Sequence, residues 1–97
     1  MIEVWKPWTV RTYNILRRYN LTITCAQDCI EIADNRHKYR NAGMRFAVEL
    51  YRAAGLGVYN IYDRLWATST DLLHPMSFDR VKMLCGDFDI LLHMSLD

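Results

Sequence analysis

Three cysteines and three histidines are the residues of this chain best suited to bind a metal ion. Cys25 and Cys29 are four positions apart, so a helix would place both thiols on one side, as half of a zinc site. Structural zinc sites, however, usually hold cysteines in C-x-x-C pairs on turns. Two small apolar core residues explain the helical spacing more simply, so we expect no metal, no cofactor and reduced thiols. The other ligands of such a site would be Cys85 and one of His37, His74 and His93.

A second chemistry to consider is nucleophilic catalysis. Ser69 and Thr70 lie close in sequence to Asp71 and His74, so a turn could bring a hydroxyl near a histidine. Nothing in the sequence orders these residues into a triad. Serine, threonine and aspartate beside a proline, here Pro75, are typical of turns and helix caps, which is the interpretation that we favour.

Two shorter patterns also have structural explanations. Asp87 and Asp89 could form an acid and base pair, but they also suit the first turn of a helix, where carboxylates satisfy backbone donors. Gly55 and Gly57 flank a single leucine, without the third glycine and preceding strand of a dinucleotide-binding loop. We interpret them as a helix terminator, and we expect the protein not to be an enzyme.

The segment from Arg36 to Arg40 is the densest group of positive charges in the chain. Arginine outnumbers lysine nine to three, which favours bidentate contacts with carboxylate or phosphate. One interpretation is a solvated helix face, in which this segment pairs with the acidic residues before it, for example Lys38 with Asp34. The others are a protein-binding surface and a nucleic-acid-binding patch.

Aromatic residues favour the protein-binding interpretation. Trp5 and Trp8 flank a lysine and Pro7 in a segment too short to be a core element, so they are either exposed anchors or folded back onto the helices. Tryptophan, tyrosine and arginine dominate the energetics of protein interfaces. The residues that we predict to bind a partner are Arg36, Lys38, Tyr39, Arg40, Arg45, Arg17, Arg18, Trp5 and Trp8.

Charge is distributed unevenly along the chain. Nine of the twelve Lys and Arg residues lie within residues 1–52, whereas six of the eleven carboxylates lie within residues 53–97, and the formal net charge is only +1. Local potential steers association even when the total charge is small, so we expect a basic and an acidic docking face. The small total charge argues against a dedicated nucleic-acid-binding domain.

The N-terminal third of the chain predicts one helix followed by a turn. Apolar residues recur at helical spacing over residues 9–20, and Thr9 is placed to cap this helix. Leu21 and Ile23 alternate with threonines as in a strand, but the pattern lasts only to residue 25, so we favour a turn. Thr24 and Gln27 then form a capping-box pattern at the start of the next helix.

An apolar seam runs from residue 25 to residue 53 at helical spacing. It predicts either one bent helix or two helices with a break near Asn41 to Gly43, because glycine is unfavourable inside a helix. Gly55 and Gly57 end this segment.

The C-terminal part predicts further helices. Val58 to Trp66 is an amphipathic helix that ends within residues 68–71, and a turn follows at His74 and Pro75. Ser77 can cap a short helix closed by Gly86. Residues 88–96 fit a strand by alternation and a helix by capping; we favour the helix because a lone strand would lack a partner.

Together these patterns predict a mainly α protein: a compact single domain, 1–97, built as a bundle of four to five helices with a short N- or C-terminal strand as an option. No stretch is long and apolar enough for a membrane span and none resembles a signal peptide, so we expect a cytoplasmic protein without a membrane partner.

We expect a non-enzymatic regulator or inhibitor that docks on a larger protein complex with an acidic surface, for example a virus- or mobile-element-encoded antagonist of a host system. The alternative is a small nucleic-acid-binding protein that uses the basic patch of residues 36–45. A homodimer is a further option, because basic and acidic halves of two copies could dock on each other.

Overall fold

The fold is all-helical over the residues that the computed structural model describes, 8–68 and 77–95, with side chains described for 8–68 and 77–87. Within these ranges there are five α-helices, one 3-10 helix and no strand, which confirms the mainly α prediction. The helices are α1 (Val10–Arg18), α2 (Ala26–Asp34), η1 (Arg36–Lys38), α3 (Met44–Ala53), α4 (Val58–Ala67) and α5 (Phe78–Ser95). None of these helices combines the length and the apolar character that crossing a bilayer requires.

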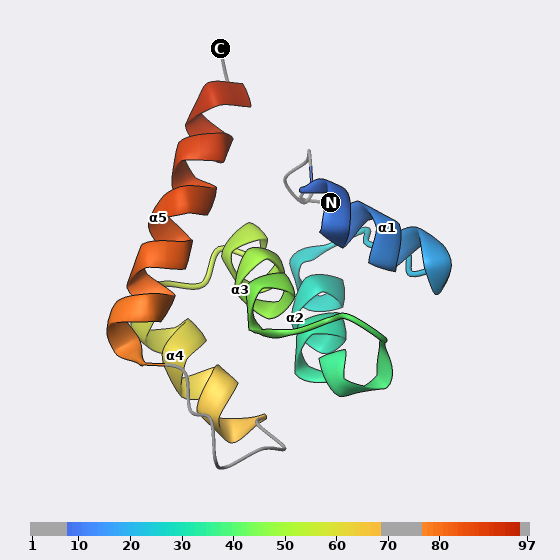
Figure 1. Ribbon diagram of the computed structural model, residues 1–97, viewed down its shortest axis with the longest axis horizontal. Helices are drawn as coiled ribbons and strands as arrows, with labels where there is room; N and C mark the ends of the chain where they lie inside the picture. The colour runs from blue at the N-terminus through green and yellow to red at the C-terminus, as the bar shows by residue number, and fades with distance from the viewer. Residues whose placement is uncertain (1–7, 69–76, 96–97) are drawn as a thin grey trace.

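Helix α3 is the centre of the molecule. It packs against α2, α4 and α5, and α4 also packs against α5 (Figure 1). Every residue of α3 from Phe46 to Tyr51 is buried, so this helix contributes to the core on all sides. In Figure 1, α1 lies at the edge of the molecule, on the side away from α5. It reaches the core through Thr12, Ile15 and Leu16.

Helix α1 begins where the sequence predicts. Thr9 is its N-cap, and the Thr9 hydroxyl accepts a hydrogen bond from the Thr12 amide, which satisfies one of the free donors of the first turn. The helix ends in a basic last turn, Arg17 and Arg18, a favourable place for positive charge beside the helix dipole.

Helix α2 also begins close to the expected place, but its first turn is capped differently. Its N-cap is Cys25, whose side chain makes no capping bond. Instead, the amide and the hydroxyl of Thr24 both donate to the Asp28 carboxylate, at 2.9 Å each. These bonds, the amide's first, lower the pKa of Asp28. Thr24 and Asp28 therefore replace the predicted capping box of Thr24 and Gln27.

The apolar seam of residues 25–53 is divided between two helices, which resolves the alternative left open by the sequence. The break is longer than expected, because α2 ends at Asp34 and α3 begins only at Met44. The intervening segment contains η1 and a left-handed residue, Asn41, with φ of 68°.

The stop after α3 lies where the glycines predict it. Gly55 has φ of +91°, a left-handed conformation that a residue with a side chain adopts at a cost, and Gly57 is the N-cap of α4. Helix α4 then ends at Ala67, and Thr68 is its C-cap, as predicted.

Helix α5 is longer than expected. Ser77 accepts a bond from the Arg80 amide at 3.2 Å and so caps the helix as predicted. Gly86 does not close the helix, however, because α5 continues through it to Ser95. The C-terminal segment is therefore helical to Ser95, and the alternative of a strand there is wrong. The predicted turn at His74 and Pro75 and the optional strand near the N-terminus lie outside the described residues.

Candidate functional site

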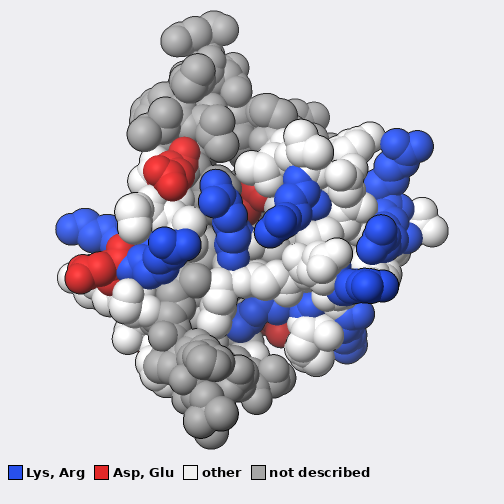
Figure 2. Space-filling view, viewed as in Figure 1, with Lys and Arg blue, Asp and Glu red and all other residues white. Residues whose placement is uncertain are grey.

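The most distinctive surface of the described residues is a group of exposed cationic side chains, here called the basic face. None of its members has an ion-pair partner within the described ranges. Figure 2 shows Lys and Arg atoms gathered on the side of the molecule where Figure 1 places α1 and η1. The members are Arg11, Arg17 and Arg18 on α1, Lys38 in η1, and Arg40 just after it.

Two tyrosines join the parts of this face that lie far apart in sequence. The rings of Tyr19, which follows α1, and Tyr39, which follows η1, pack with their centroids 5.0 Å apart. The Tyr19 hydroxyl also accepts a hydrogen bond from the Arg40 amide at 2.8 Å. These contacts fix the cations of α1 beside Lys38 and Arg40. They also occupy the Tyr39 ring, which is half-buried.

Arg36, predicted to bind a partner, lies in the interior instead. Its side chain is 7% exposed, and its Nη1 donates to the Ala33 carbonyl at 3.0 Å and to the Thr68 hydroxyl at 2.7 Å. The Thr68 hydroxyl in turn donates to the Arg64 carbonyl at 2.7 Å. Arg36 therefore connects the end of α2 to the end of α4 and presents no charge to a partner.

Asp34 does not pair with Lys38, so the expected ion pairing along one helix face is wrong. The Asp34 carboxylate accepts a hydrogen bond from the Tyr51 hydroxyl at 2.6 Å and forms an ion pair with Arg64, with Nη1 at 3.3 Å. Burial, and then the hydrogen bond to Asp34, raise the pKa of Tyr51 to about 12. Since Asp34 is used in this contact among α2, α3 and α4, Lys38 stays exposed on the surface.

A buried carboxylate, Glu49, holds α1 against α3. Its Oε1 accepts a hydrogen bond from the Thr9 amide at 2.8 Å. Its Oε2 accepts hydrogen bonds from the Thr9 hydroxyl at 3.0 Å and from the Thr12 hydroxyl. Glu49 is 7% exposed, so these bonds satisfy a charge that would otherwise be costly to bury. Glu49 is not among the functional residues predicted from the sequence. The available signal was a carboxylate inside an apolar helix, which must find donors elsewhere in the chain.

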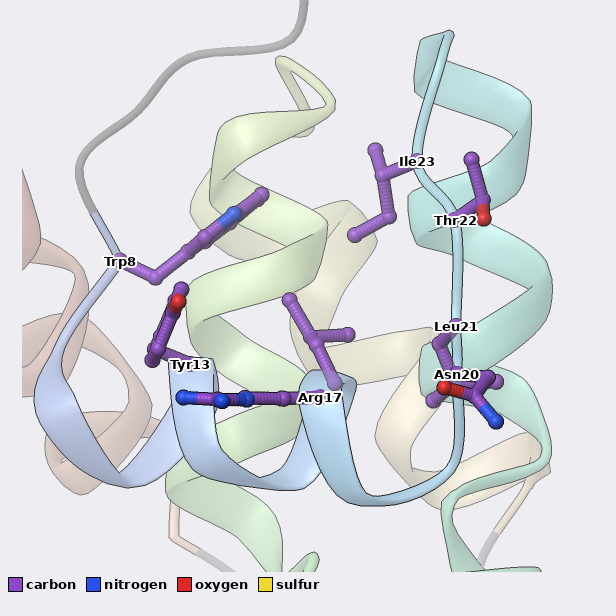
Figure 3. A pocket seen from close by; sticks show the side chains of 8 residues that line it. Trp8, Tyr13, Arg17, Asn20, Leu21, Thr22 and Ile23 are labelled. Atoms are coloured by element: carbon purple, nitrogen blue, oxygen red, sulfur yellow. The ribbon is translucent and has the colours of Figure 1, made fainter.

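A groove opens along one flank of α1, with a volume of about 560 Å³. In Figure 3, Trp8 and Ile23 point toward one another across it, and Arg17 extends along α1 beside Tyr13. We call this the α1 groove. Its lining residues are Trp8, Tyr13, Leu16, Arg17, Asn20, Leu21, Thr22 and Ile23.

The sequence predicted only two residues of the α1 groove, Trp8 and Arg17, as partner-binding. Tyr13, which is 52% exposed, was not selected, although an exposed tyrosine is a common interface residue. The alternation of Leu21 and Ile23 was the signal for the opposite wall, but it was interpreted as a turn.

A second cleft lies along α1, with a volume of about 570 Å³. Arg11 and Arg18 both line it, together with Asn14 and Asn41. Positive charge therefore borders α1 on both of its hollowed flanks, and the basic face is continuous with the α1 groove at Arg17.

The remaining predicted residues are placed as follows. Trp8 is half-buried and forms part of the groove wall, while Trp5 lies outside the described residues. Arg45 is exposed on the first turn of α3, but it already has an interaction of its own. We therefore do not include Arg45 in the basic face.

The described part of the C-terminal half does not form a single acidic face. On α5, Asp79 and Asp87 are exposed, but so are Arg80 and Lys82, and the helix presents both signs of charge. This half instead carries an aromatic cluster. Its rings pack with centroids 5.0 to 6.2 Å apart, and the cluster consists of Tyr59, Tyr62, Trp66 and Phe78.

The groups considered for catalysis and metal binding are dispersed where the structure describes them. Within those residues, no three His, Cys, Asp or Glu side chains lie close enough to hold a metal ion. Cys29 and Cys85 are buried, and burial followed by the charge of Asp28 raises the pKa of Cys29 to about 12. A thiol with that pKa is protonated at neutral pH and is a poor nucleophile. Ser69, Thr70, Asp71 and His74 lie outside the described residues.

Comparison with known proteins adds no relative to this picture: no protein-family model, no curated protein and no solved structure matches the chain. The basic face and the α1 groove are therefore the features from which a function is inferred.

Proposed function

We propose that this protein is a non-enzymatic regulator or inhibitor that binds an acidic surface of another protein or protein complex through its basic face. The narrower form of this proposal is a virus- or mobile-element-encoded antagonist of a host system that acts in the cytoplasm.

The observation that carries the proposal is the clustering of five exposed cationic side chains over α1 and η1, while other arginines are used inside the fold. Arg36 and Arg64 have internal partners, and Arg52 donates to the Leu56 carbonyl at 2.9 Å. The five cations of the basic face are exposed and lack such partners among the described residues. Unpaired arginines next to an apolar groove are well suited to bidentate contacts with carboxylates of another chain.

Reversing two charges of the basic face tests the proposal. We expect the double variant Arg17→Glu and Arg18→Glu to lose most partner capture, because the new carboxylates would repel an acidic surface. Wild type and variant would be coupled to resin at equal loading, incubated with the native cell extract, and compared by quantitative mass spectrometry. Circular dichroism should still show the folded helical signal, since both side chains are exposed and the unfavourable carboxylates beside the helix dipole cost only about 0.3–1 kcal/mol each.

A control with the same change in net charge separates the basic face from charge in general. The double variant Arg80→Glu and Lys82→Glu reverses two exposed cations on α5, away from α1. It should capture the partner as wild type does. Equal loss with both double variants, or no loss with either, would contradict the proposal.

Nucleic-acid binding is the second candidate, favoured by one observation. Tyr13 is 52% exposed and lines the α1 groove beside Arg17, so its ring could stack on a base while the arginine contacts a phosphate. Titration of labelled single- and double-stranded oligonucleotides at several salt concentrations tests this candidate. Affinity that falls steeply with salt, and falls further in Tyr13→Ala, would favour it.

A further inference from the structure

The wall of the α1 groove opposite Trp8 is a short segment whose backbone is not used by the rest of the described molecule. The Leu21 amide donates to the Leu16 carbonyl at 2.8 Å, and the Thr24 amide donates to Asp28. Between these bonds, the amides and carbonyls of Thr22 and Ile23 have no hydrogen bond to any described residue. Such groups are available to pair with the main chain of another segment.

The side chains of this segment alternate as in a strand. Leu21 and Ile23 are half-buried, whereas Thr22 and Thr24 are exposed. In Figure 3 the segment runs nearly straight, and Ile23 points into the groove while Thr22 points away from it. A strand added beside it would direct every second side chain into the same groove.

The groove has room and chemistry for such a side chain. Its volume is about 560 Å³, and Trp8, Leu16 and Ile23 supply apolar surface. These residues are held by the fold, since Leu16 is buried and Trp8 and Ile23 pack against the core. An aliphatic side chain placed between Trp8 and Ile23 would lose most of its water-exposed area.

Charge indicates which kind of segment would be bound. Helix α1 carries Arg11, Arg17 and Arg18 and no carboxylate, and the Arg17 side chain is part of the groove wall. A bound segment with carboxylates two residues away from its aliphatic residues, on the same face of the strand, would place one of them near Arg17, whereas a basic segment would be repelled.

We propose that the α1 groove binds an extended acidic peptide segment of the partner protein, which pairs its main chain with Ile23. In an extended segment the backbone groups of Thr22 and Ile23 point to opposite edges, and those of Ile23 lie on the same edge as the Leu21 amide, which is directed at α1. One aliphatic side chain of the bound segment lies between Trp8 and Ile23, and a carboxylate two residues away, on the same face of the strand, contacts Arg17. This inference rests on the proposed function and specifies the segment of the partner that the protein recognises.

The test uses the full chain and a synthetic, fluorescently labelled peptide of about six residues in which threonine occupies every second position and isoleucine and aspartate alternate at the positions between, so that both point to the same face of the strand. We expect a saturable rise in fluorescence anisotropy. Arg17→Glu should weaken binding about tenfold or more, as expected for loss of a charge-assisted contact, and Arg80→Glu should leave it unchanged. Replacing aspartate by lysine in the peptide should abolish binding.

A second peptide isolates the main-chain pairing. N-methylation of alternate backbone nitrogens keeps the side chains but removes the amide donors on one edge of the strand. Of the two possible methylation registers, one should weaken binding about tenfold and the other much less, since only one edge of an added strand faces the backbone groups of Ile23. Equal affinity for the unmodified peptide and both methylated peptides would overturn the inference.

The experiment also distinguishes the peptide from two other occupants of the groove, a nucleic acid and a second copy of the protein. Failure of the acidic peptide to bind would overturn the inference, and so would its displacement by a single-stranded oligonucleotide that binds more tightly. Sedimentation that shows two copies associating in an Arg17-dependent manner, without peptide binding, would assign the groove to self-association instead. If the peptide fails but capture of the partner still depends on Arg17 and Arg18, the proposed function stands and only this inference fails.

Discussion

Glu49 shows how one residue decides the position of a whole helix. The carboxylate lies in the buried stretch of α3 and accepts bonds from the backbone and side chain of Thr9 and from the side chain of Thr12. Both threonines lie at the start of α1. Thr9 is 40 positions and Thr12 is 37 positions from Glu49 in sequence, so Glu49 connects two distant segments of the chain. Because α1 carries three of the five members of the basic face, Glu49 positions that face without belonging to it.

We predict that Glu49→Ala lowers the free energy of unfolding by about 1–3 kcal/mol, because the Thr9 amide and the Thr12 hydroxyl would lose a buried acceptor. Urea unfolding followed by circular dichroism measures the change. Glu31→Ala is the matched control: Glu31 is an exposed carboxylate on α2 whose only described side-chain contact is with Gln27 at 3.5 Å. The control should change stability by no more than about 0.5 kcal/mol. Equal effects of the two substitutions would show that Glu49 does not anchor α1.

At the scale of the helices, local signals decide where an element starts, and tertiary packing decides how far it continues. Thr9 and Ser77 accept amide bonds from the first turns of α1 and α5 as predicted. Gly55, with φ of +91°, ends α3 as predicted. Gly86 has the same residue type but lies inside α5. A glycine is only weakly unfavourable in a helix, so the packing of Val81, Leu84 and Cys85 into the core outweighs it.

Replacing each of the two glycines by alanine should change the free energy of unfolding in opposite directions. Gly86→Ala should stabilise the protein by about 0.5–1 kcal/mol, since alanine favours the helical conformation and an added Cβ would have no atom within 4 Å. Gly55→Ala should destabilise it by about 1 kcal/mol or more, although it too has open space, because its φ is positive. The midpoints of urea unfolding provide the comparison. A stabilising Gly55→Ala would mean that the left-handed conformation is not required to end α3.

At the scale of the whole molecule, one core connects helices from both ends of the described chain. Ile15 of α1, Cys29 of α2, Tyr51 of α3 and Leu65 of α4 belong to the same buried cluster as Cys85 of α5. The surface divides differently from the core. The basic face lies over α1 and η1, whereas α5 presents both signs of charge in its described part. The unequal charge of the two halves of the sequence therefore produces one basic face, without a matching acidic face among the described side chains.

Thiol reactivity tests whether this core opens as a unit. At about pH 8 we expect an aromatic disulfide reagent to modify the half-buried Cys25 in the native protein, while Cys29 and Cys85 stay protected. Burial raises the pKa of Cys29 to about 12, so its thiol stays protonated well above the pH at which an unfolded cysteine ionises. In increasing urea, both buried thiols should become reactive together with the loss of helical signal. Modification of Cys85 well before Cys29 would indicate that α5 opens separately.

The sequence by itself determined where most of the helices begin, because those signals are local. Thr9, Gly55 and Ser77 act within one turn of their own position, and the apolar spacing of α1, α3 and α4 is visible without any knowledge of their neighbours. The sequence also shows that nine of the twelve Lys and Arg residues lie within residues 1–52.

Only the tertiary structure decided which of those charges are exposed. Arg36 and Lys38 are two positions apart in the same predicted patch. Arg36 is nevertheless buried and donates a hydrogen bond to Thr68, 32 positions away, whereas Lys38 is exposed. The α1 groove likewise requires Trp8 to lie opposite Ile23, and the position of α1 depends on Glu49. These contacts join residues distant in sequence, and they form because buried polar groups must find partners wherever the packed helices supply them.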